Sequence, residues 1–524
     1  MNIQYKGENI MLKIGWSTKD VATNDPVVLP GQFHIRVSKG CLDSMQVCAL
    51  AIDSGEDFVI FLQCDLVAAR GILDEIREKV AKRNPEIDTS KIIINVTHTH
   101  CGPLLNKGED LGSWGTLSTL PHEGVEITPP GEYREFFTNQ AAAAICEAYE
   151  GRCEGSFGYG YGYAVVAHSR RSVYTRDMSI VDAERSGETA KYINSNRPHG
   201  HAKMYGNTND EYFSHYEAGA DHYANFMFTF DENEKLTGAI INIPCPSQNS
   251  ELEEYMTSDY WGDVRAMLRE KYGDIHIMAQ CAAAGDLSPR VLHYKAAQNR
   301  RYRLKFEDFM PDTRAKYPVE LYNRRDIALR ICAAFDEVYA WAQKEKFADA
   351  VVKHSVKTIE LDRRIITDEE YAAAKAEYDA INAEVLEFVT DGTPEENLYT
   401  NSRAMCERRR RTRVLNCYEA QKTKKTIPME LHVIRIGDIA FATNTFELYM
   451  DYQHRMQARS PFAQTFIVQL CAQPDGFVTG SYLATERGVK NKGYSASQFC
   501  NQVSPAGGAQ LVEETVAELK KLAD

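Results

Sequence analysis

The chain has 524 residues, of which 44% are hydrophobic and 26% are charged, the proportions of an ordinary globular protein. Its formal net charge of −14 at pH 7 argues against a general nucleic-acid binder. No apolar run reaches the roughly 18 residues of a transmembrane helix, and residues 1–9 lack the segments of a signal peptide, so we expect a cytoplasmic protein without a membrane partner.

The first 300 residues alternate between strand-like and helix-like patterns. Strands are predicted at 47–52, 58–66 and 91–99, with an amphipathic helix at 67–82 between the last two. A long segment at 103–130 follows, rich in Gly, Ser, Thr and Pro, and carries Trp114. Irregular segments of that length are usually functional, so we interpret it as a lid or a substrate wall. A helix is predicted at 132–149.

Beyond this helix the pattern predicts a β-hairpin from strands at 223–230 and 239–244, then a helix at 263–272 and a strand at 275–280. Thr367 and Glu370 form a capping-box pattern that opens a helix to about residue 388, and a second helix is predicted at 402–421. Strands return at 431–436 and 439–443. We therefore expect one α/β (α+β) domain over 1–524, with layered mixed β-sheets flanked by helices and a helical-hairpin insertion at 365–425.

The thirteen cysteines are odd in number and contain no Cys-x-x-Cys pair. Several, such as Cys64 and Cys245, lie within apolar runs. This usage is typical of buried thiols in a reducing compartment rather than of a disulfide framework.

The motif Thr-His-Thr-His-Cys-Gly-Pro at 97–103 follows the predicted strand at 91–99. Because side chains alternate faces along a strand, His98 and His100 should project to the same side. The carboxyl end of a strand is a common place for a site in α/β proteins. An accidental pairing of one structural and one solvated histidine stays open, but the position favours a metal or catalytic site.

Three further segments supply polar groups at the ends of predicted strands. Gly-Asp-Leu-Ser-Pro at 285–289 presents Ser288 and Asp286 on a tight turn, although such a sequence is also an ordinary turn. Glu447 follows the strand at 439–443. It is either a metal ligand or general base, or a glutamate at the start of a helix that is stabilised by the helix dipole. Arg170 and Arg171 either hold an anionic group or form surface ion pairs.

The two ends of the predicted hairpin bring distant residues together. With a turn near residues 233–234, His222 falls opposite residue 245 or 246, next to the Cys-Pro-Ser-Gln segment that ends at Gln248. A one-residue error in register would reverse the facing side. Separately, the four-arginine run at 408–411 followed by Arg413 fits either a solvated helix face or a patch for an anionic ligand.

These motifs, in this order, resemble the neutral (alkaline) ceramidases. The segment at 97–103 is similar to their Thr-His-Thr-His-Ser-Gly-Pro, 285–289 to their Gly-Asp-Val-Ser-Pro, and 444–447 to their Pro-Gly-Glu region. The likeness runs from about residue 30 to the carboxyl end, through Val-Ser-Pro-Ala-Gly-Gly at 503–508. It implies a zinc-dependent amidohydrolase domain of layered sheets and helices, without the immunoglobulin-like domain that usually follows it.

The resemblance also implies roles for individual residues. His98 and Glu447 would be zinc ligands, Ser288 the serine near the scissile amide, and His100 and Arg171 (or Arg170) groups that contact substrate. We add Asp286 to the catalytic candidates, and Trp114 and Gln248 to the substrate-binding ones.

Two departures from the family pattern concern the expected metal ligands. The segment that should carry a second ligand histidine has Pro246 and Gln248 but no histidine, and the expected ligand tyrosine matches Phe477. Because the hairpin brings His222 beside the vacated position, we predict a metal triad of His98, His222 and Glu447. Three protein ligands plus water is the usual catalytic zinc arrangement.

The sequence thus predicts a metal-dependent hydrolase, with zinc as the favoured ion, that cleaves an amide in a small polar substrate. A metal-dependent glycosidase or lyase, using Asp65, Asp286 or Glu447 as acid or base, is the first alternative. A non-catalytic binding protein with a decayed site is the second. The oligomeric state is left open, with a homo-oligomer as one option.

Overall fold

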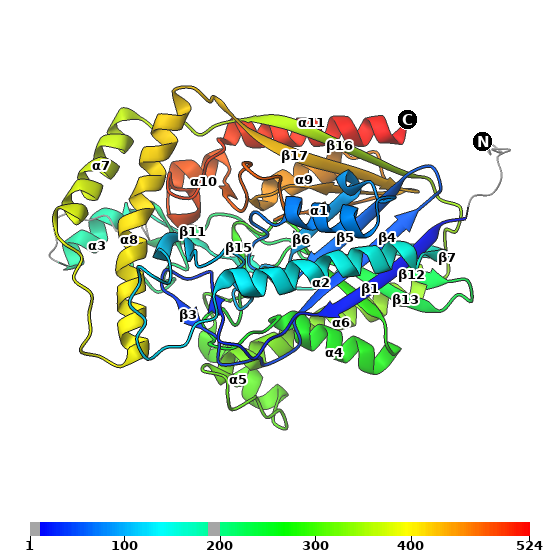
Figure 1. The fold of residues 1–524 in the computed structure, drawn as a ribbon, viewed down its shortest axis with the longest axis horizontal. Coiled ribbons are helices and arrows are strands. Elements are labelled where there is room, and N and C mark those ends of the chain that lie inside the picture. Colours follow the sequence, from blue (N-terminus) through cyan, green and yellow to red (C-terminus); the bar gives the residue numbers. More distant parts are fainter. Residues whose placement is uncertain (1–10, 187–199) are drawn as a thin grey trace.

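Two β-sheets pack face to face, and helices cover the outer side of each (Figure 1). The computed structural model describes residues 11–186 and 200–524, so the segment inspected for a signal peptide lies outside the described residues. The layered α/β architecture predicted from the sequence is confirmed.

The larger sheet has eight strands in the order β14-β13-β12-β7-β1-β4-β5-β6. Its β5–β6 and β13–β14 pairs are parallel and its other pairs antiparallel. In chain order the strands are β1 (Lys13–Asp20), β4 (Gln46–Asp53), β5 (Phe58–Cys64), β6 (Ile92–Val96), β7 (Cys153–Tyr163), β12 (Tyr223–Asp231), β13 (Leu236–Ile243) and β14 (His276–Cys281).

The smaller sheet has four strands in the order β16-β17-β18-β20, of which only the last pair is parallel. The strands are β16 (Val352–Asp362), β17 (Thr426–Ile436), β18 (Ile439–Thr443) and β20 (Gln464–Val468). The remaining strands form short ladders: β2 (Val28–Leu29) with β3 (Arg36–Val37), β8 (His168–Ser169) with β15 (Leu287–Ser288), β9 (Arg171–Tyr174) with β10 (Ala202–Met204) and β11 (Phe213–Tyr216), and β19 (Glu447–Leu448) with β21 (Tyr482–Leu483).

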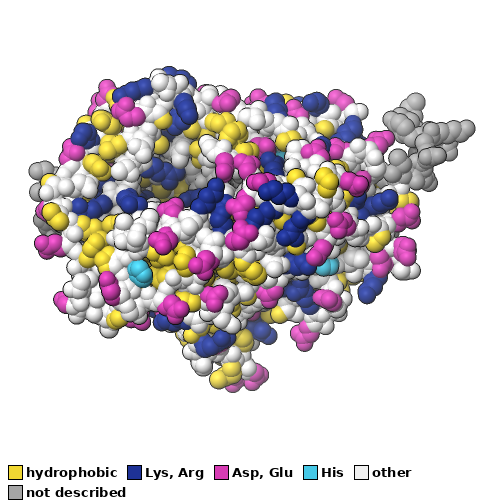
Figure 2. Space-filling view, viewed as in Figure 1, with side chains coloured by type: hydrophobic (Ala, Val, Ile, Leu, Met, Phe, Trp, Pro, Cys, Tyr) yellow, Lys and Arg dark blue, Asp and Glu magenta, His cyan; other side chains and the backbone are white. Residues whose placement is uncertain are grey.

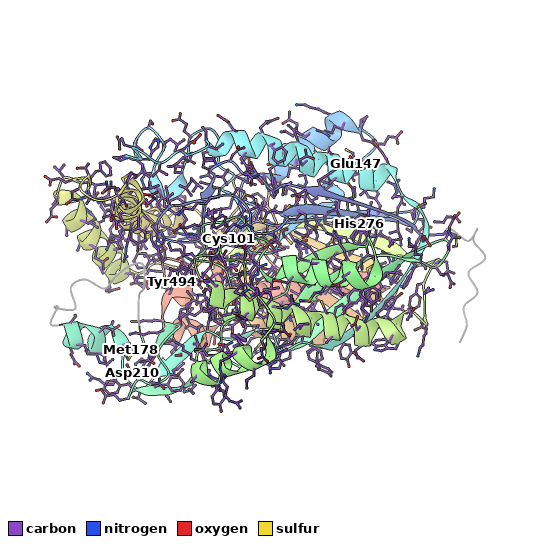
Figure 3. All side chains as sticks on the ribbon, turned by 90° about the horizontal axis from the view of Figure 1, so that it is seen from below. Cys101, Glu147, Met178, Asp210, His276 and Tyr494 are labelled. Atoms are coloured by element: carbon purple, nitrogen blue, oxygen red, sulfur yellow. The ribbon has the colours of Figure 1, made fainter. Side chains whose placement is uncertain are left out.

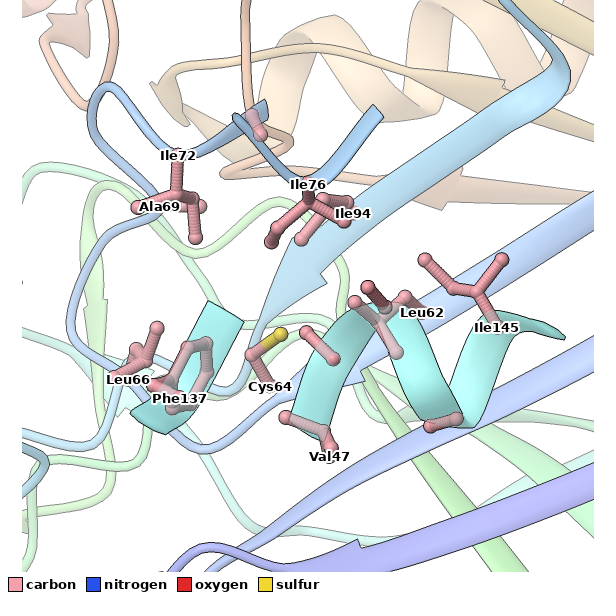
Figure 4. Close-up of a cluster of buried hydrophobic side chains, with 14 of the residues drawn as sticks. Val47, Leu62, Cys64, Leu66, Ala69, Ile72, Ile76, Ile94, Phe137 and Ile145 are labelled. Atoms are coloured by element: carbon pink, nitrogen blue, oxygen red, sulfur yellow. The ribbon is translucent and has the colours of Figure 1, made fainter. Parts of the chain in front are cut away.

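Successive side chains of β4 and β5 point to opposite faces of the large sheet, so the sheet packs against a separate apolar core on each face. Leu50 and Phe61 point into the layer between the sheets, where they meet Phe441 of the smaller sheet. Their neighbours Ala49 and Leu62 point to the opposite face and pack under the helices α1 (Leu73–Arg83) and α2 (Pro130–Glu150) (Figure 4). Because both faces are covered, these strands are apolar along their whole length.

Further helices complete the outer layers. On the large sheet α4 (Tyr260–Tyr272) and α6 (Pro318–Ala342) cover β12, β13 and β14. On the small sheet the cover is α9 (Met450–Arg459) and α11 (Pro505–Ala523). The remaining helices lie toward the ends of the layers and are α3 (Met178–Ser186), α5 (Lys295–Lys305) and α10 (Glu486–Asn491).

The predicted helical excursion is a pair of helices at one end of the molecule (Figure 1). The first, α7 (Asp368–Ala383), begins at the capping box of Thr367 and Glu370, as the sequence indicates. The second, α8 (Pro394–Gln421), begins eight residues before the predicted start, at another capping box from Thr393 to Glu396. Proline is favourable at the first helical position, which allows α8 to start there.

Two predicted boundaries are wrong in a way that matters for the histidine motif. The helix expected at 67–82 begins only at Leu73, and β6 ends at Val96 rather than 99. His98 has a φ angle of 66°, so the chain turns at this residue. The two histidines therefore do not share a side by strand alternation.

Neither a membrane-spanning helix nor a disulfide is found where the structure describes the chain. None of its described helices combines the length and apolarity needed to cross a membrane. All thirteen cysteines are free, and most are buried, as predicted from their scattered placement.

A buried ion pair ties the loops around β9 to the carboxyl-terminal region. The guanidinium of Arg171 is fully buried and makes two hydrogen bonds to Glu217, at 2.5 and 2.9 Å. It also donates to the Ser495 hydroxyl and to the carbonyls of Gly488 and Lys492. Removing one partner of such a pair leaves a charge buried without compensation.

We therefore expect Glu217→Ala to lower the free energy of unfolding by about 3 to 5 kcal/mol, measured by urea denaturation. Glu513→Ala, which breaks the exposed pair between Glu513 and Arg459, is the matched control and should change stability little. Equal effects of the two substitutions would contradict the structural role of the buried pair.

Asp286 anchors the start of α9. Its carboxylate accepts a hydrogen bond from the backbone N–H of Met450 at 3.1 Å, which satisfies one of the free donors of the first turn. The side chain is buried, and burial raises its pKa to about 6. Between the unfolded pKa near 4 and this value the native state binds more protons, so ionisation of Asp286 destabilises the fold as pH rises through this window.

Replacing Asp286 by Asn should remove this pH dependence while keeping an oxygen for the Met450 N–H. Between pH 4 and 7, wild type should lose about 2 to 3 kcal/mol of unfolding free energy relative to Asp286→Asn. Urea denaturation at half-unit pH steps measures the difference. If the difference in unfolding free energy between wild type and Asp286→Asn stays constant with pH, Asp286 is not the titrating group.

Candidate active site

One cavity of about 1100 Å³ brings together the carboxyl end of β6, the loop containing Trp114, helix α8 and the segment around β19 and β21. Its walls include His98, His100, Glu447 and Tyr482. Figure 3 shows Cys101, the residue after His100, near the middle of the molecule in that view, and both histidines are buried.

His98 is held in one tautomer by the backbone. Its Nδ1 lies 2.7 Å from the carbonyl oxygen of Val67, which can only accept, so Nδ1 carries a proton. Its Nε2 lies 3.5 Å from Oε2 of Glu447. An imidazole fixed in this way presents Nε2 either as a protonated partner of the carboxylate or as a ligand atom. The left-handed backbone of a non-glycine residue here is the kind of strain that clusters at functional sites.

Two hydrogen bonds in series, from Arg170 to Gln248 and from Gln248 to His100, fix the ring of His100. Arg170 donates to Oε1 of Gln248 at 3.1 Å, which turns the Gln248 amide N–H toward Nε2 of His100 at 2.8 Å. The Nδ1 of His100 then carries the proton and points to Oε2 of Glu251, 3.6 Å away. Burial, followed by the nearby charges of His98 and arginines, holds the pKa of His100 well below its usual value, so it is neutral. The backbone of Gly31 lies so close to this ring that a Cβ there would overlap it.

Arg170 is the centre of a network behind the cavity wall. It is almost fully buried, and it donates to the Gly285 carbonyl at 2.8 Å and to the Tyr482 hydroxyl at 3.1 Å. The same nitrogen lies 3.5 Å from Oε2 of Glu447. Gly285 is required for this approach, because a Cβ would stand 2.3 Å from the Glu447 carbonyl oxygen. This explains the glycine of the Gly-Asp-Leu-Ser-Pro motif.

Glu447 is ionised in this setting. Burial alone would raise its pKa, but the neighbouring imidazole of His98, the guanidinium of Arg170 and a hydrogen bond from Tyr482 outweigh burial and hold the pKa below its usual value. Parallel pairing of β19 with β21 places Glu447 directly beside Tyr482. Burial raises the pKa of Tyr482 well above its usual value, so its phenol is protonated and can donate to the carboxylate.

Several predicted site residues lie away from the cavity. His222 is exposed and is not among the cavity residues, and the paired residues of β12 and β13 end at Asn225 and Asn242, before His222 is reached. No three His, Cys, Asp or Glu side chains in residues 11–186 and 200–524 converge as a metal group, so the His98, His222 and Glu447 triad does not form. The strands pair as expected, but the His222 side chain points to solvent.

Ser288, Asp286 and Arg171 serve the fold in this structure. Ser288 is fully buried, and its hydroxyl accepts from the backbone N–H of Arg290. Asp286 anchors α9, and Arg171 is paired with Glu217. None of the three lines the cavity. Asp65, considered for a glycosidase, is paired with Arg265 at 2.6 Å and is fully buried.

Trp114 and Gln248 take different positions. Trp114 lines the cavity and donates from its indole nitrogen to the Phe33 carbonyl at 3.3 Å, so the long segment that carries it forms part of the wall. Gln248 lies behind the wall, where it connects Arg170 to His100. Both Gln248 and Arg170 therefore position other groups.

The donor set fits a divalent ion in a form different from the predicted triad. His98 Nε2 and Glu447 Oε2 are two ligand atoms on neighbouring sides of one space, and the Tyr482 hydroxyl beside them is a third. Histidine, carboxylate and a phenol oxygen suit zinc, with water completing the set. Phe477 was matched to the family's tyrosine by sequence, but it does not line the cavity; Tyr482 does.

Sequence reasoning missed the basic residues of the cavity. Arg70 follows β5, and Arg409 and Arg413 come from α8. The arginine run at 408–413 was a signal for Arg409 and Arg413. Which of its arginines face the cavity depends on how α8 packs, and the sequence does not give that.

Two solved structures share the fold. A neutral ceramidase from Pseudomonas aeruginosa aligns with 98% of this chain and 74% of its own, with a TM-score of 0.62 and 15% identity. A ceramidase complexed with C2 aligns with 98% of this chain and 75% of its own, with a TM-score of 0.60 and 13% identity. No protein-family model and no curated protein matches the sequence. At these identities the likeness shows the architecture: the chain has the neutral-ceramidase fold.

Proposed function

We propose that the protein is a zinc-dependent amide hydrolase acting on a small polar substrate in the cytoplasm. The observation that carries this proposal is the pairing of His98 with Glu447 inside a large cavity, with the other imidazole nitrogen fixed by a backbone carbonyl. The neutral-ceramidase fold supports amide cleavage and does not favour the glycosidase or lyase alternative.

In this proposal His98, Glu447 and Tyr482 hold the ion. When bound, zinc would polarise the scissile carbonyl and lower the pKa of a bound water. The neighbouring His98, and then Arg170, hold the pKa of Glu447 below its usual value, so its carboxylate is ready to bind a cation at neutral pH.

The neighbouring imidazole of His100 is the proposed hydrogen-bond donor to the developing oxyanion. It meets His98 edge to face with ring centres 5.0 Å apart, and both rings line the cavity. The pKa of His100 is held well below the usual value, so the ring is neutral at neutral pH. Its Nε2 accepts from Gln248, which leaves the proton on Nδ1, and Nδ1 makes no hydrogen bond within the described part of the chain. Arg170 and Gln248 orient it through the chain of hydrogen bonds described above.

Metal content separates this proposal from a non-catalytic binding protein. After dialysis against zinc and then buffer, we expect wild type to retain one zinc per chain by mass spectrometry of the native protein or elemental analysis. His98→Ala and Glu447→Gln should lower zinc affinity by at least about 100-fold, since each removes a direct ligand. His222→Ala is the control and should keep the metal. Loss of zinc from His222→Ala with retention in His98→Ala would overturn the ligand assignment.

Activity against a panel of aryl amides with acyl groups of different size and charge tests the reaction. For any substrate that is cleaved, we expect His98→Ala to lower kcat/KM by at least about 100-fold and His222→Ala to leave it unchanged. His100→Gln should act mainly on kcat, since a donor to the developing oxyanion works in the chemical step. Cleavage that survives His98→Ala at the wild-type rate would rule out this site as the source of activity.

A further inference from the structure

The cavity is lined by five basic side chains that form no ion pair with a carboxylate anywhere in the described part of the chain: Arg70, Arg363, Arg409, Arg413 and Lys424. We propose that its ligand is a polyanion, a compound with two or more carboxylate or phosphate groups besides the bond to be cleaved. This inference rests on the proposed function and adds the chemical class of its substrate.

Helix α8 supplies its contribution along one face. Its cavity residues include Cys406, Arg409, Arg413, Asn416 and Ala420, with the spacing of three and four residues that lines up side chains on a helix. Arg409 donates only to the Gly112 carbonyl, at 3.0 Å, and no described hydrogen bond engages Arg413. Both guanidinium groups thus have donors to spare for a ligand.

Arg408 and Arg411 of the same run do not line the cavity and have partners in α7 or just after it. Arg411 pairs with Glu377 of α7 at 3.1 Å, and Arg408 donates to the Glu384 carbonyl. The run at 408–413 therefore divides into residues that attach α8 to α7 and residues that line the cavity. The other interpretation of this run was a solvated helix face held by ion pairs within the helix. Arg403 and Glu407 form such a pair, whereas Arg409 and Arg413 line the cavity.

Other walls of the cavity add positive charge. Arg70 is accessible to solvent from the cavity, and its one described hydrogen bond is to the Gly480 carbonyl at 3.4 Å. The enclosing walls and then the charge of Arg413 on the same cavity lower the pKa of Arg70 from its usual value. Arg363 donates to the Lys424 carbonyl from the far end of the small sheet.

The cavity contains little negative charge to balance its basic side chains. Among the described residues, Glu447 is the one carboxylate that lines the cavity, and the buried guanidinium of Arg170 lies 3.5 Å from it. The whole chain has a formal net charge of −14, so this concentration of cations runs against the overall composition. Figure 2 shows Lys and Arg side chains in the hollow beside α8. Uncompensated guanidinium groups in a partly enclosed space favour an anionic ligand, and their planar donors suit carboxylate and phosphate oxygens.

The cavity also has room for more than the scissile amide. Its volume of about 1100 Å³ lies at the top of the range for small-molecule sites. Trp114 and Tyr494 present ring faces or edges on its walls, which suit the apolar or planar part of a ligand. The anionic groups of a ligand whose amide lies at His98 would then extend toward α8.

Binding of defined anions to the intact protein tests this inference without requiring activity. Fructose 1,6-bisphosphate and citrate are the phosphate and carboxylate probes, and fructose is the neutral probe, each measured by titration calorimetry. We expect at least one anion to bind and fructose not to bind, with an affinity that falls as NaCl rises. The double variant Arg409→Gln and Arg413→Gln should weaken anion binding by about 100-fold, roughly tenfold for each lost charged contact.

The matched control is the double variant Arg403→Gln and Arg408→Gln, which removes the same charge from the same helix outside the cavity. It should bind the anion as wild type does. Equal weakening in the two double variants, or no anion binding by wild type, would overturn the inference. The anion site and the proposed hydrolase can fail separately. Wild type that binds the anion but shows neither zinc binding nor hydrolysis would refute the hydrolase and support the anion site. His98→Ala, which removes a proposed zinc ligand, should still bind the anion.

Discussion

The buried guanidinium of Arg170 is the interaction on which the site depends. It is attached to the carbonyl of Gly285, the hydroxyl of Tyr482, the amide of Gln248 and the carboxylate of Glu447. These partners come from four separate segments, so one planar group with five donors sets their relative positions. A buried cation of this kind needs a carboxylate nearby, which keeps Glu447 ionised and beside His98.

Architecture explains why this arrangement is rigid. The loop that follows β6, the segment before β15 and the segment at β19 all lie at the ends of strands in one of the two packed sheets or in the ladders beside them. Helices cover both outer faces, so the strands are fixed by two apolar layers as well as by their hydrogen bonds. The chain can therefore hold a strained His98 and buried charges where a small domain could not.

Helix α8 gives the cavity much of its charge. Arg409, Arg410 and Arg413 of this helix line the cavity, while Arg408 and Arg411 attach α8 to α7 and the residue after it. An acidic protein thus has a basic interior cavity. In the proposed function, the strand ends supply the reacting groups and α8 supplies the selection for charge.

Local pattern determined much of this protein. Apolar runs and alternation were enough to predict β4, β5, β12, β13 and the parallel strand β6, and the capping box predicted the start of α7, because these signals arise from neighbours in the chain. The motif at 97–103 and Glu447 likewise pointed to a site from the sequence alone. What tertiary structure decided was orientation. His222 faces solvent, Tyr482 rather than Phe477 stands beside Glu447, and Arg409, Arg410 and Arg413 of the run at 408–413 line the cavity while Arg408 and Arg411 do not. Each of these outcomes depends on how separate segments pack, and a linear pattern carries no information about which side of a strand end or helix a distant segment will cover.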